Sequence, residues 1–331
     1  RLLVKKKQSF LEMDSDIEII HVVKVGHLVP SSLVTVHLSP EYNRKVPPFH
    51  KAINGLSEST FKRDKDMSCS NCSCDEVDVI WKERLHRNPR LFNGTKFRIH
   101  NVTSSDDDEK HVIMFLGVTD YKEYLGTNWA PNVKTLQEKG IELHTNSQAF
   151  LSDALGVGAS VVTIDNYIVL LRRSEHCAEA PDMWDVPGGH AEPKKIVGDK
   201  PLKEIDVSSM NKTAVINEIF DSIVQEVTDE VNIPLTHLGV PLYMGTHRNT
   251  TSAGRPSLAF EIRCSLSSED IRALYNQGNQ QEADESTNIT FVALNEIAAL
   301  AAQKQEFWKK LAPSAKGNLT VFTLVHGLQK L

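Results

Sequence analysis

A helical stretch that carries paired carboxylates constrains this chain more than any other feature. Apolar residues recur through residues 213–231 at the three- and four-residue spacing of an amphipathic helix, and Pro234 follows the run. Glu226 and Glu230 are four positions apart, so they project from nearly the same side of the helix, and Asp229 flanks them. The pattern predicts a helix with an acidic group at the edge of its buried stripe.

Two interpretations of these acids stay open on the helix alone. Like charges at this spacing repel, and a half-buried carboxylate is costly unless something pairs with it. A Mg²⁺ ion would remove both penalties, because it is a hard cation that prefers oxygen ligands. The alternative is an ordinary acidic helix face in solvent, which is common.

A glycine turn upstream favours the ligand interpretation. Trp184-Asp185-Val186 is typical of a short strand, and Pro187 is expected to end its pairing in the middle of a sheet. Gly188-Gly189 permit positive φ angles and allow a ligand to approach the backbone closely. An acid such as Asp185 inside an apolar strand needs a partner. The turn alone is a common structural element, but the acids downstream suggest a binding site.

Composition excludes several classes of function. The net charge of −6 argues against a nonspecific nucleic-acid binder, and we find no apolar run of the ~18–20 residues that a membrane span needs. The odd count of 5 cysteines favours a reduced compartment, so we expect a cytoplasmic protein, with a nuclear pool as an alternative. Cys69, Cys72 and Cys74 have metal-like spacing, but no second pair of ligands follows at finger spacing, which favours a flexible linker over a zinc site.

The order of the expected elements predicts an α/β protein with three parts. Residues 1–75 are expected to form a poorly structured N-terminal extension with weak strands, residues 76–150 an α/β domain, and residues 151–331 a second domain. Further expected elements are strands at 17–25, 34–38, 96–102, 111–118, 159–164, 167–171, 184–187, 239–246 and 257–264, and helices at 77–86, 133–139, 268–275, 295–300 and 315–328. The helix at 133–139 is expected to stop at Gly140, and Asp165-Asn166 to form a hairpin turn.

The glycine turn and the acidic helix together resemble the two halves of a Nudix box, G-x5-E-x7-R-E-U-x-E-E-x-G-U, in which U is aliphatic. Gln225 stands at the arginine position, and Asn232, which tolerates left-handed backbone, at the final glycine. Lys195 falls where the first glutamate would stand. Glu226 follows Gly189 by 37 positions (226 − 189), so about 22 residues, around 194–211, are inserted in what we expect to be a polar loop.

Other stretches resemble one Nudix branch, the UDP-glucose and UDP-galactose pyrophosphatases with an interrupted box, over roughly residues 76–330. They are Pro89-Arg90-Leu91-Phe92, Lys96-Phe97-Arg98, Thr119-x-Tyr121, Leu125-Gly126-Thr127-Asn128-Trp129, Leu155-Gly156-Val157-Gly158, Ala178-Glu179-Ala180-Pro181, Thr251-Ser252-Ala253-Gly254-Arg255 and Pro313-Ser314-Ala315-Lys316-Gly317.

The resemblance implies a Nudix αβα sandwich with an N-terminal α/β domain that contributes to the substrate site. It implies Glu226, Asp229 and Glu230 as catalytic residues, with Glu226 and Glu230 as Mg²⁺ ligands. The implied substrate-binding residues are Phe92, Tyr121, Arg173, Ala178, Asp185, His190 and Glu192. For each of these residues an ordinary structural role is the alternative.

The activity that the resemblance implies is Mg²⁺-dependent hydrolysis of UDP-glucose and UDP-galactose to UMP and a sugar 1-phosphate. The general base stays open between Glu261, Glu285 and an acid of the box. The alternatives are another Nudix substrate, or a catalytically silent Nudix fold that binds nucleotides. The expected partner is a small-molecule UDP-sugar; neither nucleic acid nor membrane is expected, and no protein partner can be inferred, even if residues 40–75 are a partner-binding tail.

Overall fold

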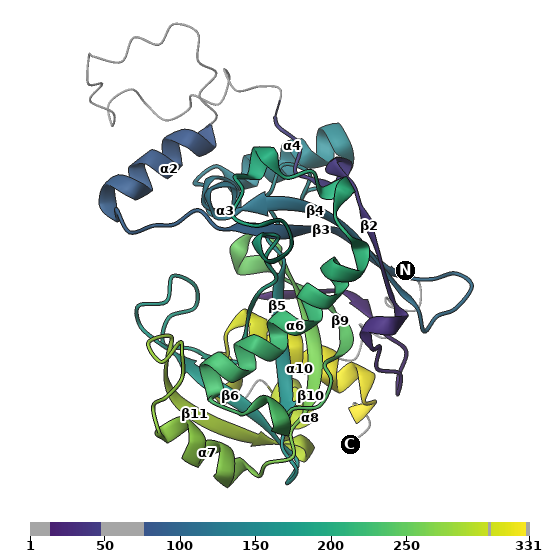
Figure 1. Ribbon diagram of the computed structural model, residues 1–331, viewed down its shortest axis with the longest axis vertical. Coiled ribbons are helices and arrows are strands. Elements are labelled where there is room, and N and C mark those ends of the chain that lie inside the picture. Colours follow the sequence, from purple (N-terminus) through teal and green to yellow (C-terminus); the bar gives the residue numbers. More distant parts are fainter. Residues whose placement is uncertain (1–13, 48–75, 304–305, 329–331) are drawn as a thin grey trace, which may run out of the picture.

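The computed structural model describes residues 14–47, 76–303 and 306–328, and two β-sheets organise them (Figure 1). The larger sheet has eight strands in the order β1-β9-β10-β5-β6-β11, with β7 paired to β6 and β8 paired to β5. Its strands are β1 (Ile17–Val22), β5 (Gly156–Val162), β6 (Tyr167–Arg173), β7 (Trp184–Asp185), β8 (Gly188–His190), β9 (Leu242–Asn249), β10 (Arg255–Arg263) and β11 (Ser286–Ala293).

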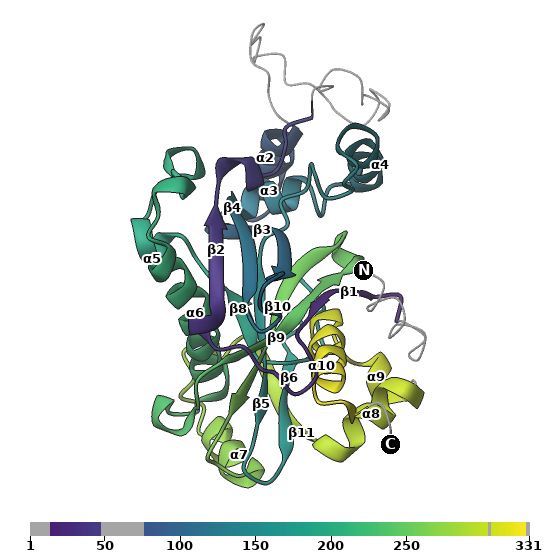
Figure 2. The ribbon, with the colours of Figure 1, turned by 90° about the vertical axis from the view of Figure 1, so that its right-hand side faces the viewer.

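Helices cover both faces of the larger sheet. Figure 2 shows α6 (Lys212–Val231) on one face and α10 (Pro313–Val325) on the other. The apolar stripe of α6 packs against the sheet and is fully buried at Ile219, Ile223 and Val227, because a helix stabilises the fold by burying one face against a sheet. Shorter helices complete the layers: α5 (Lys194–Val197), α7 (Ser268–Asn276), α8 (Leu294–Gln303) and α9 (Glu306–Lys309). This is the expected αβα sandwich.

A smaller sheet packs against the sandwich. It has the order β2-β4-β3, with β2 (Val34–Leu38), β3 (Thr95–Ser104) and β4 (Val112–Asp120), and α2 (Glu76–Arg87), α3 (Tyr121–Gly126) and α4 (Val133–His144) lie beside it (Figure 1). Buried side chains of both sheets form one continuous hydrophobic core. Leu155 N donates to Phe97 O at 2.9 Å where the chain enters the larger sheet. The two sheets therefore pack as one unit.

Residues 14–47 contain the two expected strands, but they are integrated into the fold and do not form a poorly structured extension. β1 pairs with β9 in the larger sheet, and β2 pairs in parallel with β4 in the smaller one. Tyr42 O accepts a hydrogen bond from Arg98, and Asn43 Oδ1 accepts one from Val118 N. Long-range strand pairing overrides the weak local signal of this region, so residues 40–43 belong to the fold rather than to a tail. Cys69, Cys72 and Cys74 lie outside the described residues.

Local predictions held where a short-range rule determined the backbone. β5 and β6 form the expected hairpin, with Asn166 in the left-handed region at φ 65°. Asn232 caps α6 at φ 67°, as an asparagine in place of glycine should. The predicted stop at Gly140 is wrong: α4 continues to His144 and ends at Thr145, with φ 54°. Gly140 instead gives room to Asn146 O, which would stand 2.5 Å from a Cβ there.

The inserted segment 194–211 is not simply a polar loop. It forms α5 and two 3₁₀ turns, η3 (Leu202–Glu204) and η4 (Val207–Ser209), and it buries Val207 and Met210 in the core. Asn211 Oδ1 then accepts from Ala214 N at 3.0 Å and caps the start of α6. The insertion therefore leaves the acidic helix docked on the sheet. The remaining 3₁₀ turns are η1 (Ser31–Leu33), η2 (Pro40–Tyr42), η5 (Leu235–His237) and η6 (Thr250–Ser252).

Candidate active site

One cavity of about 720 Å³ lies where β8, α6 and the smaller sheet meet. Its wall draws on both halves of the chain, with Lys96 and Tyr121 from the smaller sheet and its helix, and Arg173, Asp185 and His190 from the larger sheet. Small-molecule sites are usually concave, with a few polar groups that converge from several elements, and this cavity has both features.

Backbone amides of β8 hold the two helix acids. Gly188 N donates to Glu230 Oε2 at 2.9 Å, and His190 N donates to Glu226 Oε1 at 3.3 Å. A Cβ on Gly189 would stand 1.9 Å from Glu226 Oε1, so any larger residue there would have to displace the Glu226 carboxylate. The reason for this glycine is close approach and not the positive φ that we expected, since neither Gly188 nor Gly189 has one.

Pro187 does not end the pairing of this segment, which corrects a second expectation. β8 continues beyond the proline and pairs antiparallel with β5, with Gly156 opposite His190. Pro187 O accepts from Ala159 N at 2.9 Å, so the residue takes part through its carbonyl, which needs no N–H. This pairing fixes the backbone that holds Glu226 and Glu230.

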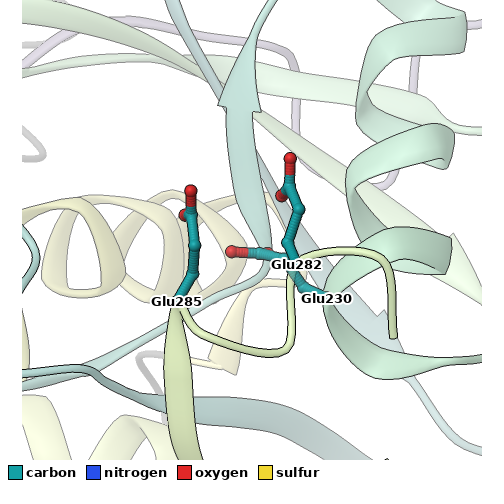
Figure 3. Close-up of side chains that lie close together, drawn as sticks. All are labelled: Glu230, Glu282 and Glu285. Atoms are coloured by element: carbon teal, nitrogen blue, oxygen red, sulfur yellow. The ribbon is translucent and has the colours of Figure 1, made fainter. Parts of the chain in front are cut away.

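Two acids from the loop before β11 face the helix acids. One carboxylate oxygen from each of Glu230, Glu282 and Glu285 lies within 4.8 Å of those of the other two, and Figure 3 shows the three side chains gathered together. Glu282 N donates to Asp229 O at 3.2 Å, and Glu285 O accepts from Ser174 N at 2.8 Å. These bonds tie the loop to the end of α6 and to the sheet.

Crowding and burial disfavour negative charge in this cluster. Burial, with a smaller contribution from Glu282, raises the pKa of Glu226 to about 7. Burial, and then the neighbouring Glu226, holds the pKa of Glu230 well above its ordinary value. Burial and then Glu285 raise the pKa of Glu282. A divalent cation would relieve all three, and an all-oxygen donor set of this kind suits a hard ion. The acids present therefore fit such an ion.

Basic side chains lie on the same cavity wall. Arg173 Nη1 lies 3.5 Å from Asp185 Oδ2, and Ser314 Oγ donates to that oxygen at 2.6 Å, so the acid inside the strand has the partners that it needs. Glu192 pairs with Lys194 at 2.6 Å and with Lys96 from the smaller sheet. Anionic groups of a ligand would meet positive charge here.

Most of the predicted residues meet in this cavity. Those that line it are Tyr121, Arg173, Ala178, Asp185, His190, Glu192, Glu226 and Asp229, and Glu230 belongs to the acidic cluster. Phe92 is not among the lining residues, and 64% of it is exposed. Asp229 accepts two hydrogen bonds from Gln225 Nε2, at 2.8 and 2.7 Å, so the glutamine at the arginine position holds this acid.

Two candidates for the general base, Glu261 and Glu285, come from outside the acidic helix, and they differ in position. Glu285 lines the cavity beside the helix acids. Glu261 is buried within β10, where it accepts from Arg263 Nε at 2.6 Å and pairs with His326 Nε2 at 2.5 Å, and it is not a lining residue. The position of Glu261 therefore argues for a structural role.

Sequence reasoning missed several residues of the cavity. Lys96, Glu179 and Arg255 lie in stretches that carried the resemblance, but no role was assigned to them. No sequence pattern marked Glu282 as a cavity residue, because its loop contacts α6 only in the tertiary fold. These missed residues are Lys96, Glu179, Lys194, Glu218, His247, Arg255 and Glu282.

Known proteins resemble the chain over most of its length. Uridine diphosphate glucose pyrophosphatase NUDT22 of Bos taurus is 39% identical over 319 residues, 95% of this chain and 99% of that protein. The protein of the same name from Mus musculus is 38% identical, covering 94% of this chain and 91% of its own length. Nudix hydrolase 9 of Arabidopsis thaliana is 35% identical over 69% of this chain and 75% of that protein. The chain belongs to the Nudix hydrolase family.

Membership explains the divided motif. In this Nudix hydrolase the two halves of the box, far apart in sequence, meet where β8 lies against α6. Nudix hydrolases generally use a divalent metal, which agrees with the acidic cluster. No family model matches the chain. Within the described parts of the chain, no helix is both long and apolar enough to cross a bilayer.

Proposed function

We propose that this Nudix hydrolase splits UDP-glucose and UDP-galactose, with Mg²⁺, into UMP and glucose 1-phosphate or galactose 1-phosphate. The observation that carries the proposal is a cavity whose wall combines acids of the carboxylate cluster with Arg173, Lys96 and Lys194. The names of the NUDT22 relatives support the nucleotide sugar as the substrate. Water adds to one phosphorus atom, and the bond from that phosphorus to the bridging oxygen breaks.

Each part of the cavity has a role in this reaction. Glu226 and Glu230, with Glu282 beside them, would hold the metal ion. When bound, the ion would neutralise diphosphate charge and lower the pKa of water. Arg173 would bind a phosphate oxygen, and its attraction grows as charge develops there. Asp185, Ala178, His190 and Glu192 would orient the sugar and phosphate, and Tyr121 would meet the nucleotide.

Asp229 and Glu285 are the two candidates for accepting the proton of the attacking water. Both line the cavity, whereas Glu261 is paired inside the sheet. Glu285 lies on the loop and has no carboxylate hydrogen bond within the described residues, so it has free oxygens for a proton. Asp229 is engaged by Gln225. The geometry therefore supports Glu285 as the general base.

The test is product chromatography on a panel of UDP-glucose, UDP-galactose, ADP-ribose, dinucleoside polyphosphates and coenzyme A esters, with and without Mg²⁺. We expect release of UMP from the UDP-sugars only when Mg²⁺ is present. If the protein hydrolyses another compound of the panel and neither UDP-sugar, then that compound is the substrate and the proposed substrate is wrong. No metal-dependent turnover of any compound would indicate a nucleotide-binding module.

A further inference from the structure

Arg255 reaches from the start of β10 to the ring of His190. Its Nη1 lies 3.3 Å from His190 Nε2. A guanidinium group has only N–H donors and no acceptor, and it keeps its charge in proteins. In this contact Nε2 must therefore be the acceptor, so it carries a lone pair and no proton.

The surrounding residues hold Arg255 in place. Its Nη2 lies 3.3 Å from Glu179 Oε2. The other oxygen of Glu179 accepts from Asn249 Nδ2 and from Ser252 Oγ, both at 2.7 Å. Arg255 is 8% exposed, and the ion pair with the half-buried Glu179 holds its guanidinium in place.

A glycine makes room for the contact. Gly156 stands opposite His190 in the β5–β8 pairing, and a Cβ there would lie 2.9 Å from Arg255 Nη1 and 2.6 Å from Ser257 Oγ. Any side chain at 156 would push the guanidinium away from the imidazole. The His190 ring is thus held by Arg255, which Glu179 fixes in place and for which Gly156 leaves room.

His190 has its other ring nitrogen available. Within the described residues Nδ1 makes no hydrogen bond, and His190 lines the cavity. Because Nε2 accepts from a guanidinium group, the ring is neutral and its one proton sits on Nδ1.

We propose that Arg255 is a positioning residue that holds His190 in the neutral tautomer with its proton on Nδ1, so that Nδ1–H donates to an oxygen of the bound nucleotide sugar. The identity of the ligand rests on the proposed function, but the tautomer does not. In this role His190 is a fixed donor that orients the substrate and takes no proton from it.

The first experiment is long-range ¹H–¹⁵N NMR of the full chain labelled at histidine, without substrate or metal. The His190 ring signals are those that disappear in His190→Gln. We expect the Nδ1–H pattern in the wild type and a shift toward Nε2–H in Arg255→Met. An Nε2–H ring in the wild type overturns the proposal, as does an unchanged Nδ1–H ring in a folded Arg255→Met protein.

Two variants make the result specific. Arg172→Met is the control: it removes an exposed arginine that pairs with Asp182 and does not line the cavity, so the His190 tautomer should not change. Glu179→Gln keeps Arg255 but weakens the ion pair that holds it, so it should give a mixture of His190 tautomers. This variant replaces Arg255→Met in the test if Arg255→Met does not fold. A pure Nδ1–H signal in Glu179→Gln would contradict the support that Glu179 provides.

Kinetics then test the contact with substrate. The hydrogen bond from His190 to the substrate should be equally strong in the bound ground state and in the transition state. Its loss in Arg255→Met should therefore raise KM for UDP-glucose about tenfold, with little change in kcat. An unchanged KM in a variant whose tautomer has switched would overturn the contact. Absence of UDP-sugar turnover in a wild-type protein with the Nδ1–H ring would refute the proposed function and leave the tautomer standing.

Discussion

Gly189 and Glu226 lie so close that the backbone of one limits the side chain of the other: a Cβ at position 189 would stand 1.9 Å from Glu226 Oε1. This contact joins the two halves of the interrupted Nudix box across 37 positions of sequence (226 − 189). Any change in the spacing of β8 and α6 therefore moves the carboxylate of Glu226, which we propose as a metal ligand.

Gly189→Ala should abolish most of the activity while the protein stays folded. The added methyl must push Glu226 or β8 aside, and a displacement of this kind can cost about 100-fold in rate. UMP release under saturating Mg²⁺ measures the effect. Gly94→Ala is the control, because its Cβ would meet only ordinary contacts, at 3.7 Å or more, near the same cavity. Equal rates for the two variants would argue against this packing.

Glu226→Gln and Glu230→Gln should each lower turnover by several orders of magnitude, because a neutral amide is a far weaker ligand for Mg²⁺. Without metal, both variants should melt at or above the temperature of the wild type, since the change removes charge from a crowded acidic cluster. Glu138→Gln, an exposed residue of α4, should change neither quantity. Near-wild-type turnover of both cluster variants would refute the metal site on α6.

Arg98→Met should destabilise the protein by about 3–5 kcal/mol, because it leaves a buried acid without its counter-charge. Arg98 Nη2 lies 3.6 Å from Asp153 Oδ2, and the guanidinium also donates to the carbonyls of Tyr42, Leu151 and Gln148. Urea denaturation measures the loss. Asp153→Asn in the Arg98→Met background should recover part of it, since the charge is gone and asparagine tolerates the φ of 48° at that position. No recovery would mean that the carbonyl contacts dominate.

Acid should destabilise the protein through His21. Burial lowers the pKa of His21 to about 4, so the unfolded chain binds its proton first and the free energy of unfolding falls as the pH drops below about 6.5. The loss from pH 7 to pH 5 is about 2 kcal/mol, and it levels off near the folded pKa. His21→Phe should flatten the slope by that amount. His247, with its pKa lowered to about 3, contributes with the same sign, so the difference between wild type and variant isolates His21. Equal slopes in both proteins would disprove this assignment.

Local rules determined much of the fold from the sequence alone. The periodicity of residues 213–231 depends only on contacts within a helix and on one buried face, and α6 follows it to within one residue at its start. Asn232 marked a left-handed position and Asn166 a hairpin turn, because asparagine tolerates that backbone. Glu226 and Glu230 shared a helix face for the same geometric reason, so the core of the site could be named before any contact was known.

Only the tertiary structure decided which distant groups meet. β1 and β2 have weak local signals, but pairing with β9 and β4 makes them part of the two sheets. Glu282 joined the acidic cluster because its loop docks on α6, and Arg255 reached His190 because β5, β8 and β10 place them side by side. Phe92 shared the same sequence signal and yet lies outside the cavity wall. Such contacts depend on how strands and loops far apart in the sequence pack together, and no local rule of spacing encodes that packing.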